Sequence, residues 1–371
     1  MRLCDPLLPV LADEFGTSLS AAAATTTGFA LAYGGAQLAF GALGDRFSRL
    51  AVIVVAMTAA GLATVASALA PTLDLLVAAR VATGAFAAAA IPLSLAWIGD
   101  NVPFAGRQLV LARYLVGQML GMTAGQVGAG VLAELLGWRA AFWLIALLFA
   151  VAVLMLQGPA RHDAARATRA PGGLLAHTRR LLRDRWAMVV IGTVTLEGTI
   201  LFGAVALVAS YLQREFGVSP ATAGTVSALF GLGGLLYAFN ARRLLVRLQP
   251  AGLSRLGGIV FALAMLVLIV QRRWEPAILA SLAAGLGYYM LHNTLQTQAT
   301  QLSTEARAAA LAWFASGLWI GQGIGVTATA AVAERIGFVP VFGAAAVALA
   351  VLGAAFGRAV ARRHPVRADP G

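Results

Sequence analysis

The chain has 371 residues, of which 60% are hydrophobic and only 11% are charged. A water-soluble domain is about 45–50% apolar and about 25% charged, so this chain has too little polar surface for water, and we expect the bilayer to be its main solvent. The absence of lysine and the single cysteine, Cys4, exclude lysine Schiff bases, P-loop chemistry, internal disulfides and thiolate metal cages. We therefore predict no metal site and no cofactor.

Residues 1–14 are apolar but shorter than the about 20 residues that a transmembrane helix needs. Asp5, Pro6 and Pro9 interrupt the run, which does not fit a cleaved signal peptide. We interpret the segment as the outer half of a first transmembrane helix, left by a misassigned start codon or by loss of the other half.

Eleven complete apolar spans follow, and one basic segment divides them. Because the segment 158–185 has seven arginines, two acids and leucines at helical spacing, we predict an amphipathic helix on the membrane surface, with a solvated linker as the alternative. The predicted regions are an N-terminal bundle at 1–157, the linker at 158–185, a C-terminal bundle at 186–360 and a tail at 361–371. The predicted spans are 18–43, 49–69, 72–99, 107–133, 138–157, 186–212, 217–240, 252–271, 274–300, 305–333 and 338–360.

The arginines predict the orientation of the spans, because loops on the cytoplasmic side collect positive charge. With the linker and the C-terminus in the cytoplasm, one side carries Arg46, Arg49, Arg107, Arg242, Arg243, Arg247, Arg255, Arg307 and the arginines of the tail. The other side carries Arg139, Arg214, Arg272, Arg273 and Arg335. We therefore assign the net charge of +12 to the membrane topology of an inner (plasma) membrane protein and not to nucleic-acid binding.

The two halves of the sequence repeat each other at an offset near 200. The stretch from Glu14 to Ser18 recurs from Glu215 to Ser219 as Glu-Phe-Gly-x-Ser. Further on, Arg107, Gly117, Gly121, Gly125, Ala133, Glu134, Gly137 and Phe142 recur exactly 200 positions later. A parallel repeat of this kind predicts two homologous bundles about an axis along the membrane normal, with a substrate site near the midplane between them.

The hairpin after the first complete span carries Gly41, Leu43, Asp45, Arg46 and Arg49. This spacing resembles the loop signature of the major facilitator superfamily, with a serine in place of the signature's second glycine. The resemblance implies that Asp45 docks near the start of the eleventh helix and that the arginines close the cytoplasmic side. The loop is our candidate gate.

Two further motifs support this resemblance. Arg80, followed four residues later by Gly84, resembles the motif of the fourth helix, and the glycines Gly117, Gly121 and Gly125 resemble the fifth-helix motif of the drug/proton antiporters. Glycines at every fourth position allow a second helix to approach closely, so we assign these four glycines to helix packing. The family's proline after the third of them is Gln126 here, which weakens the antiporter assignment. A weaker structural marker is Gly137-Trp138-Arg139-x-x-Phe142.

Our candidates for proton coupling are Arg80 and Glu197, deep within their spans, and Asp5 in the truncated first helix. A charge at such depth is costly, so Arg80 and Glu197 should face the protein interior, and Asp5 is a candidate partner for Arg80. The superfamily implies a role for Arg80 in proton coupling. The alternatives are a purely structural ion pair and a glutamate that is hydrogen-bonded for packing.

Polar side chains in the tenth span are our candidates for solute contacts. His292 and Gln296 share one helical face, Asn293 lies beside them, and Tyr288 and Tyr289 precede them by about one turn. A histidine that is merely satisfied in the core is the alternative for His292. Glutamines in other spans complete the set: Gln37, Gln118 and Gln126.

Taken with the resemblance, these residues predict an all-α membrane protein with the major facilitator fold: two six-helix bundles related by a pseudo-twofold axis, with eleven full spans and a truncated first helix. We expect a monomeric secondary transporter that exports a small organic solute against proton entry, with the proton gradient as its energy source. An importer of a sugar or other polar metabolite is the nearest alternative. A transport-dead sensor is another, and an enzyme would need a clustered nucleophile, metal set or carboxylate pair, which the sequence does not offer.

Overall fold

The structure, a computed structural model, describes residues 2–165, 178–179, 181–302 and 307–363, and leaves out the side chains of a few residues inside helices. Every element in these ranges is a helix. The first half contains η1 (Asp5–Leu7), α1 (Leu8–Glu14), α2 (Leu19–Arg46), α3 (Arg49–Ala68), α4 (Leu73–Ala87), α5 (Ala90–Asn101), α6 (Phe104–Leu136) and α7 (Trp138–Ala165). The second half contains α9 (Arg185–Glu197), η2 (Gly198–Phe202), α10 (Gly203–Ala206), α11 (Val208–Phe216), α12 (Pro220–Val270), α13 (Pro276–Thr300), α14 (Arg307–Ile336) and α15 (Phe338–Arg363). Most of the predicted amphipathic linker lies outside the described residues.

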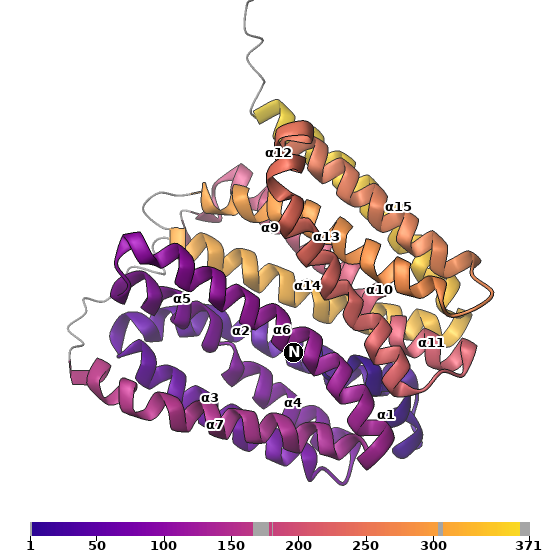
Figure 1. The fold of residues 1–371 in the computed structure, drawn as a ribbon, viewed down its shortest axis with the longest axis horizontal. Helices are drawn as coiled ribbons and strands as arrows, with labels where there is room; N and C mark the ends of the chain where they lie inside the picture. The colour runs from indigo at the N-terminus through magenta and orange to yellow at the C-terminus, as the bar shows by residue number, and fades with distance from the viewer. Residues whose placement is uncertain (1, 166–177, 180, 303–306, 364–371) are drawn as a thin grey trace, which may run out of the picture.

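The helices form two bundles that lie side by side (Figure 1). The elements up to α7 make one bundle and those from α9 onward make the other. Two pairs of helices join them, because α14 packs along α2 and α12 packs along α6. These four helices, two from each half of the chain, build most of the surface between the bundles, and η1 and α1 add contacts with α11 and α12.

Turns that follow the repeat have matching backbone geometry. Gly16 and Gly217 have φ values of 58° and 64°, a left-handed conformation that glycine adopts without steric cost. In each copy the serine two residues later begins the next helix, since the Ser18 hydroxyl accepts a hydrogen bond from Ala21 N and the Ser219 hydroxyl accepts one from Thr222 N. The repeated sequence therefore encodes the same stop and restart of a helix.

Gly137 and Gly337 show the same correspondence. Their φ values are 85° and 87°, and each lies between two long helices, where the chain reverses within a single residue. Together with Gly16 and Gly217 they mark one end of the bundles, called here the Gly16 face. The opposite end, where the turn at residues 47–48 lies, is called the hairpin face.

Eight helical segments of the described chain are long and apolar enough to cross a membrane, fewer than the eleven predicted spans. One reason is that α12 contains two of them. The chain bends at Gln249, whose φ is 55°, and continues from Pro250 without a loop. The other reason is that α2 and α13 have the length of a span, with 28 and 25 residues, but are absent from this apolar set.

The two repeated glycine stripes have different surroundings. In the second half, a Cβ atom at Gly321 would lie 2.1 Å from the carbonyl oxygen of Thr195, and one at Gly325 would lie 2.0 Å from that of Thr199. The stripe therefore lets α14 touch the backbone of α9 and η2. Gly84 has a comparable role, since its Cβ would lie 2.3 Å from the carbonyl oxygen of Phe29.

The close approach expected at Gly117, Gly121 and Gly125 does not occur, because no atom lies within 4 Å of a Cβ built at any of them. The described part of the first half has no element in the position that α9 and η2 occupy in the second. The contact on α6 is made further along, at Gly130, whose Cβ would lie 2.3 Å from the carbonyl oxygen of Pro220 on α12.

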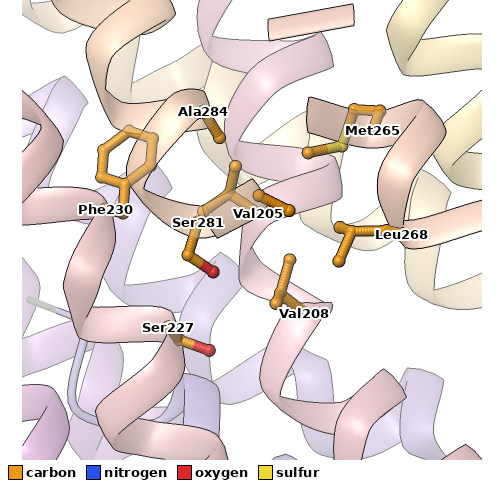
Figure 2. Close-up of a pocket in the computed structure, with 9 residues that line it drawn as sticks. Val205, Val208, Ser227, Phe230, Met265, Leu268, Ser281 and Ala284 are labelled. Atoms are coloured by element: carbon orange, nitrogen blue, oxygen red, sulfur yellow. The ribbon is translucent and has the colours of Figure 1, made fainter. Parts of the chain in front are cut away.

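A small void inside the second bundle is too narrow for an organic solute. It lies between α10, α11, α12 and α13, and its walls include Phe230, Met265 and Ser281 (Figure 2). Its volume is about 10 Å³, which is the space of about one water molecule. This void therefore cannot hold a transported solute.

The different surroundings of the stripes predict different responses to the same substitution. Gly321→Ala should lower the melting temperature of the purified protein by several degrees, because the added methyl group would overlap the Thr195 carbonyl group. The matched variant Gly121→Ala should leave it unchanged or raise it, because alanine favours a helix over glycine by about 1 kcal/mol. Equal melting temperatures for the two variants would contradict the packing described here.

Candidate functional site

A buried acid–base pair lies in the second bundle. His292 Nδ1 and Glu197 Oε2 are 2.7 Å apart, and the side chain of Glu197 is 0% exposed. Glu197 follows the start of α9 by twelve residues, so it lies about 18 Å along the helix, near the middle of the bilayer. The other carboxylate oxygen, Oε1, has no partner. The pair joins two residues that sequence analysis assigned to different roles.

Local backbone structure positions Glu197. The α-helix ends at this residue and continues as the π-helical turn η2. Such turns are rare and occur frequently at functional sites. Gly198 makes the position possible, because a Cβ there would lie 2.3 Å from the carbonyl oxygen of Leu318 on α14. Only glycine lets α14 cover the carboxylate this closely.

Aromatic rings hold the imidazole of His292. Tyr288 stacks on it with 4.8 Å between ring centroids, and Phe314 of α14 lies tilted against it at 5.3 Å. The histidine side chain is 12% exposed, whereas the Glu197 side chain is 0% exposed. The imidazole therefore lies between the enclosed carboxylate and the solvent-accessible surface. Beside it, the amide of Asn293 donates a hydrogen bond of 2.6 Å to the hydroxyl group of Tyr237. Gln296, predicted on the same wall, is exposed at the next turn.

A second buried pair connects the bundles. Arg2 Nε donates to Asp5 Oδ2 at 2.7 Å, and both side chains are buried. The Arg2 guanidinium lies 5.6 Å and 5.4 Å from the ring centroids of Phe202 and Phe230, which belong to the other bundle. These two rings contact Tyr288 in turn. A continuous aromatic cluster thus runs from Arg2 to His292.

Sequence analysis missed Arg2 and assigned the wrong partner to Asp5. The expected ion pair between Asp5 and Arg80 does not form, because Asp5 binds the arginine three residues before it. Arg80 is buried, with its guanidinium 4.3 Å from the ring centroid of Phe29. Its Nε and Nη2 atoms have no hydrogen-bond partner. The i,i+3 spacing of Arg2 and Asp5 within an apolar run was the signal that could have identified the pair.

The three candidate glutamines have different environments. Gln37 on α2 and Gln126 on α6 are buried, and each has a side-chain polar atom without a partner, Oε1 and Nε2 respectively. Gln126 lies where α6 meets α12, since its carbonyl oxygen would be 2.8 Å from a Cβ at Gly224. Gln118 is exposed. Two buried polar side chains therefore face the junction of the bundles.

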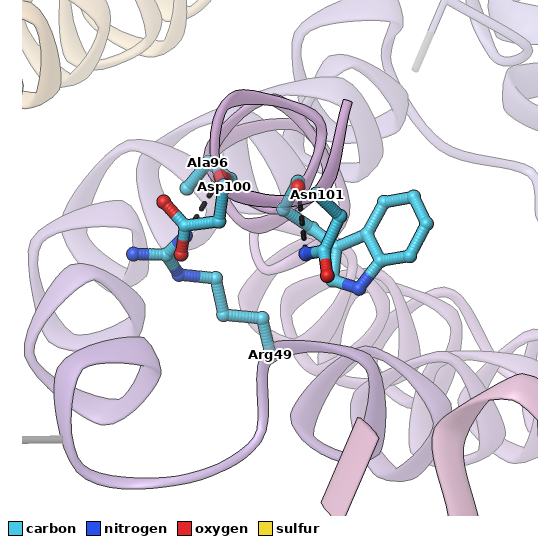
Figure 3. Close-up of polar contacts among 5 residues, drawn as sticks. Arg49, Ala96, Asp100 and Asn101 are labelled. Atoms are coloured by element: carbon cyan, nitrogen blue, oxygen red, sulfur yellow. Dashed lines mark hydrogen bonds and ion pairs between the residues drawn. The ribbon is translucent and has the colours of Figure 1, made fainter. Parts of the chain in front are cut away.

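The hairpin is anchored within the first bundle (Figure 3). Arg49 Nη1 donates a 2.7 Å hydrogen bond to the carbonyl oxygen of Ala96 and forms a short ion pair with Asp100. The Ser48 hydroxyl accepts from Ala51 N and so begins α3, a capping role that glycine at this position would lack. Arg46 is exposed. The surroundings of Gly41, the side chain of Asp45 and residues 303–306, which precede α14 where Asp45 was expected to dock, lie outside the described residues.

Several direct contacts between the bundles lie toward the Gly16 face, and others, such as the 4.6 Å ring contact of Tyr33 with Trp319, lie near their middle. Gln213 donates to the carbonyl oxygen of Pro6 at 2.9 Å, and Ala221 N donates to the Glu134 carboxylate at 3.3 Å. Further along the interface, the hydroxyl groups of Thr27 and Thr327 are 3.0 Å apart. Near the same face, a hydrogen bond from the Arg139 guanidinium lowers the pKa of Glu14 and joins α7 to α1.

The hairpin side of α6 is exposed at Gly117, Gln118 and Gly121. These residues lie on the stripe whose counterpart on α14 packs against α9 and η2, and the described part of the first half has no element in that position. Along the other pair of helices, α2 and α14 stay in contact past their middle, since a Cβ at Gly34 would lie 3.0 Å from the carbonyl oxygen of Ser316. Gln126 and the Arg2–Asp5 pair are buried at the interface, and Gln37 is buried on α2.

This arrangement can take up and release a proton at a protected position. An isolated charge in hydrocarbon is costly, and an imidazole beside a carboxylate offers a partner in either protonation state. No group of three histidine, cysteine, aspartate or glutamate side chains that could hold a metal ion occurs in the described residues.

Comparison with known proteins gives a consistent family match. The family model described as Major Facilitator Superfamily matches residues 2–301 and 199–371. The 4-hydroxybenzoate transporter PcaK of Pseudomonas aeruginosa is 28% identical over 338 residues, which cover 76% of this chain and 74% of that protein. The multidrug efflux pump LfrA of Mycolicibacterium smegmatis is 24% identical, covering 71% of this chain and 63% of the pump.

Other matches are shorter or structural. The lincomycin resistance protein of Streptomyces lincolnensis is 30% identical, but the match covers 47% of this chain and 37% of that protein. The first curated relatives are matched over about a quarter to a half of their length, from 24% to 49%. A solved POT family transporter bound to a thioalcohol-conjugated peptide has a TM-score of 0.80 at 11% identity, over 98% of this chain and 92% of that chain. At this identity the likeness concerns the fold.

The buried pair predicts a non-additive response to substitution. His292→Leu leaves the Glu197 carboxylate without a partner, and breaking one side of a buried pair is destabilising by about 3–5 kcal/mol. Replacing both residues, as in Glu197→Leu/His292→Leu, removes the uncompensated charge. We expect the double variant to melt at a higher temperature than the single one. Melting temperatures that fall additively would show that the two side chains are not coupled.

Proposed function

The chain belongs to the Major Facilitator Superfamily of transporters, and we propose that it exports a small organic solute by alternating access, driven by proton entry. The observation that carries the proposal is the enclosed Glu197–His292 pair. Intramembrane carboxylates and histidines mark proton pathways in pumps and transporters. The other deeply enclosed pair among the described residues, Arg2 with Asp5, contains an arginine, which stays protonated, whereas a histidine can gain or lose its proton near neutral pH.

Alternating access is supported by the parallel repeat of the two bundles. Parallel-repeat transporters work by rocking one bundle against the other around a central site. Toward the Gly16 face the bundles are joined by polar contacts, for example the bond from Ala221 N to Glu134, and by the close approach of Gly130 to Pro220. A hydrogen bond to a charged group such as this carboxylate contributes about 1.5–3 kcal/mol. Contacts of this size can break and reform during a transport cycle.

The aromatic cluster indicates how proton and solute are linked in this proposal. Tyr288 contacts His292 on one side and the rings beside Arg2 on the other. A solute between the bundles would touch Asn293 and the tyrosines while the proton is held by Glu197 and His292. The proton's arrival changes the charge beside the solute, so binding of one affects binding of the other. Asp5 acts on this cluster through its pair with Arg2, whereas Arg80 lies against Phe29 and Phe142.

Export of a partly apolar solute is supported by two relatives that are described as a multidrug efflux pump and as a lincomycin resistance protein. Under the positive-inside rule the arginine-rich hairpin face would be the cytoplasmic one, which is the side from which an exporter loads its cargo.

Import of an aromatic acid is the second candidate. One relative, matched over three quarters of both chains, is described as a 4-hydroxybenzoate transporter. Two buried arginines with unpartnered nitrogen atoms, Arg2 and Arg80, would suit an anionic solute. The direction of the proton gradient that drives accumulation distinguishes this candidate from export.

Reconstituted vesicles test the proposal. We predict that a pH gradient drives a compound from a panel that includes lincomycin and 4-hydroxybenzoate, and that a pH-sensitive dye reports proton movement with it. Glu197→Gln should abolish gradient-driven accumulation, by at least about tenfold, and keep solute exchange without a gradient. Glu334→Gln, an exposed carboxylate on α14, is the matched control and should behave as the unmodified protein. Full gradient-driven flux in Glu197→Gln would refute the assigned role.

A further inference from the structure

A groove of about 520 Å³ lies on the second bundle, outside the proposed transport site. It runs between the hairpin-face part of α12 and the middle of α13. Its walls combine three leucines with one amide and two guanidinium groups: Leu236, Leu244, Leu286, Asn240, Arg243 and Arg247. Neither the family assignment nor the proposed transport mechanism accounts for it.

The groove changes from apolar to basic along the membrane normal. Asn240 follows Pro220, the first residue of α12 at the Gly16 face, by twenty residues, which is about 30 Å of helix. This length equals the hydrocarbon thickness of a bilayer, about 30 Å. Arg243 and Arg247 therefore lie at headgroup depth. Leu286, only ten residues into α13, lies near the bilayer midplane, so the deep end is lined by hydrocarbon.

The groove lies on the side of α12 that faces away from α6. At Gly231, α12 touches α6, since a Cβ there would lie 2.5 Å from the Thr123 hydroxyl oxygen. Asn240 follows Gly231 by nine residues, or about two and a half helical turns, which places it on the opposite side of α12. The exposure of Leu236 and Phe239, 48% and 84%, is consistent with a lipid-facing surface.

The two arginines have no counter-charge of their own. The sequence has no aspartate or glutamate between Glu215 and Glu275, and neither Arg243 nor Arg247 forms an ion pair with a described residue. They are four residues apart on one helix, so their guanidinium groups are neighbours and repel each other. Guanidinium groups bind phosphate through paired hydrogen bonds. A phosphate between them would remove the repulsion.

We propose that this groove binds one anionic phospholipid. The lipid phosphate lies between Arg243 and Arg247, and an acyl chain extends along Leu236, Leu244 and Leu286 toward the midplane. Basic pockets between transmembrane helices are typical sites for anionic headgroups. The bound lipid fills the space between α12 and α13, the helix that carries His292. This site does not depend on which solute is transported or in which direction.

Native mass spectrometry of the delipidated protein in a neutral detergent tests the proposal. Phosphatidylglycerol should bind as one retained molecule, on the order of tenfold more tightly than phosphatidylcholine with the same acyl chains. Inorganic phosphate at millimolar concentration should not displace it, because the acyl chain supplies part of the affinity. Equal binding of the two lipids, or displacement by phosphate alone, would overturn the lipid assignment on the unmodified protein.

Variants then locate the site. Arg243→Gln/Arg247→Gln should reduce phosphatidylglycerol affinity on the order of tenfold. The control Arg242→Gln/Arg362→Gln removes the same charge from two exposed arginines at the hairpin face that do not line the groove, and it should retain the affinity. An equal loss in both variants would show non-specific attraction and overturn the assignment to this groove.

Discussion

The hydrogen bond between Glu197 and His292 lies at mid-bilayer depth, where protein must replace lipid around the ionisable side chains. Hydrocarbon offers no hydrogen bonds, so an ionisable side chain at mid-bilayer must be covered by other helices. Here α13 supplies the imidazole, and α14 covers the carboxylate because Gly198, Gly321 and Gly325 allow backbones to touch. The glycine content of these helices is thus a requirement of the buried acid.

The same constraint explains the contacts between the bundles. Arg2 and Asp5 neutralise each other, and the aromatic rings of the opposite bundle cover the guanidinium. Separation of the bundles toward the Gly16 face would withdraw these rings from Arg2 and break the bonds at Pro6 and Glu134. Each of these interactions contributes about 0.5–3 kcal/mol. The interface is therefore held by several weak interactions, which can break when the bundles rock against each other.

The fold could be predicted from the sequence because its signals are local and long. Apolar runs predict the spans, and the Glu-Phe-Gly-x-Ser stretches at Gly16 and Gly217 predict matching turns.

The site could be predicted only in part. Glu197 and His292 were both identified, but their pairing spans 95 positions and requires three helices to be placed. Asp5 was paired with Arg80 because only the depth of these charges in the membrane was considered. The pair of Arg2 and Asp5 can be recognised from the i,i+3 spacing of the sequence, without any tertiary structure. The glycine stripe that begins at Gly117 has the sequence of a packing surface. Only the fold shows that no described helix covers this stripe, whereas its counterpart at Gly317 is covered.

The central claim is that the bundles must part toward the Gly16 face during each cycle. The hydroxyl groups of Thr27 and Thr327 lie 3.0 Å apart across that interface, so Thr27→Cys/Thr327→Cys, made with Cys4→Ala, should form a disulfide under mild oxidation. The decisive measurement is solute exchange in vesicles before oxidation, after oxidation and after reduction. The account predicts that exchange stops when the disulfide forms and returns when it is reduced. Full exchange by the cross-linked protein would contradict it.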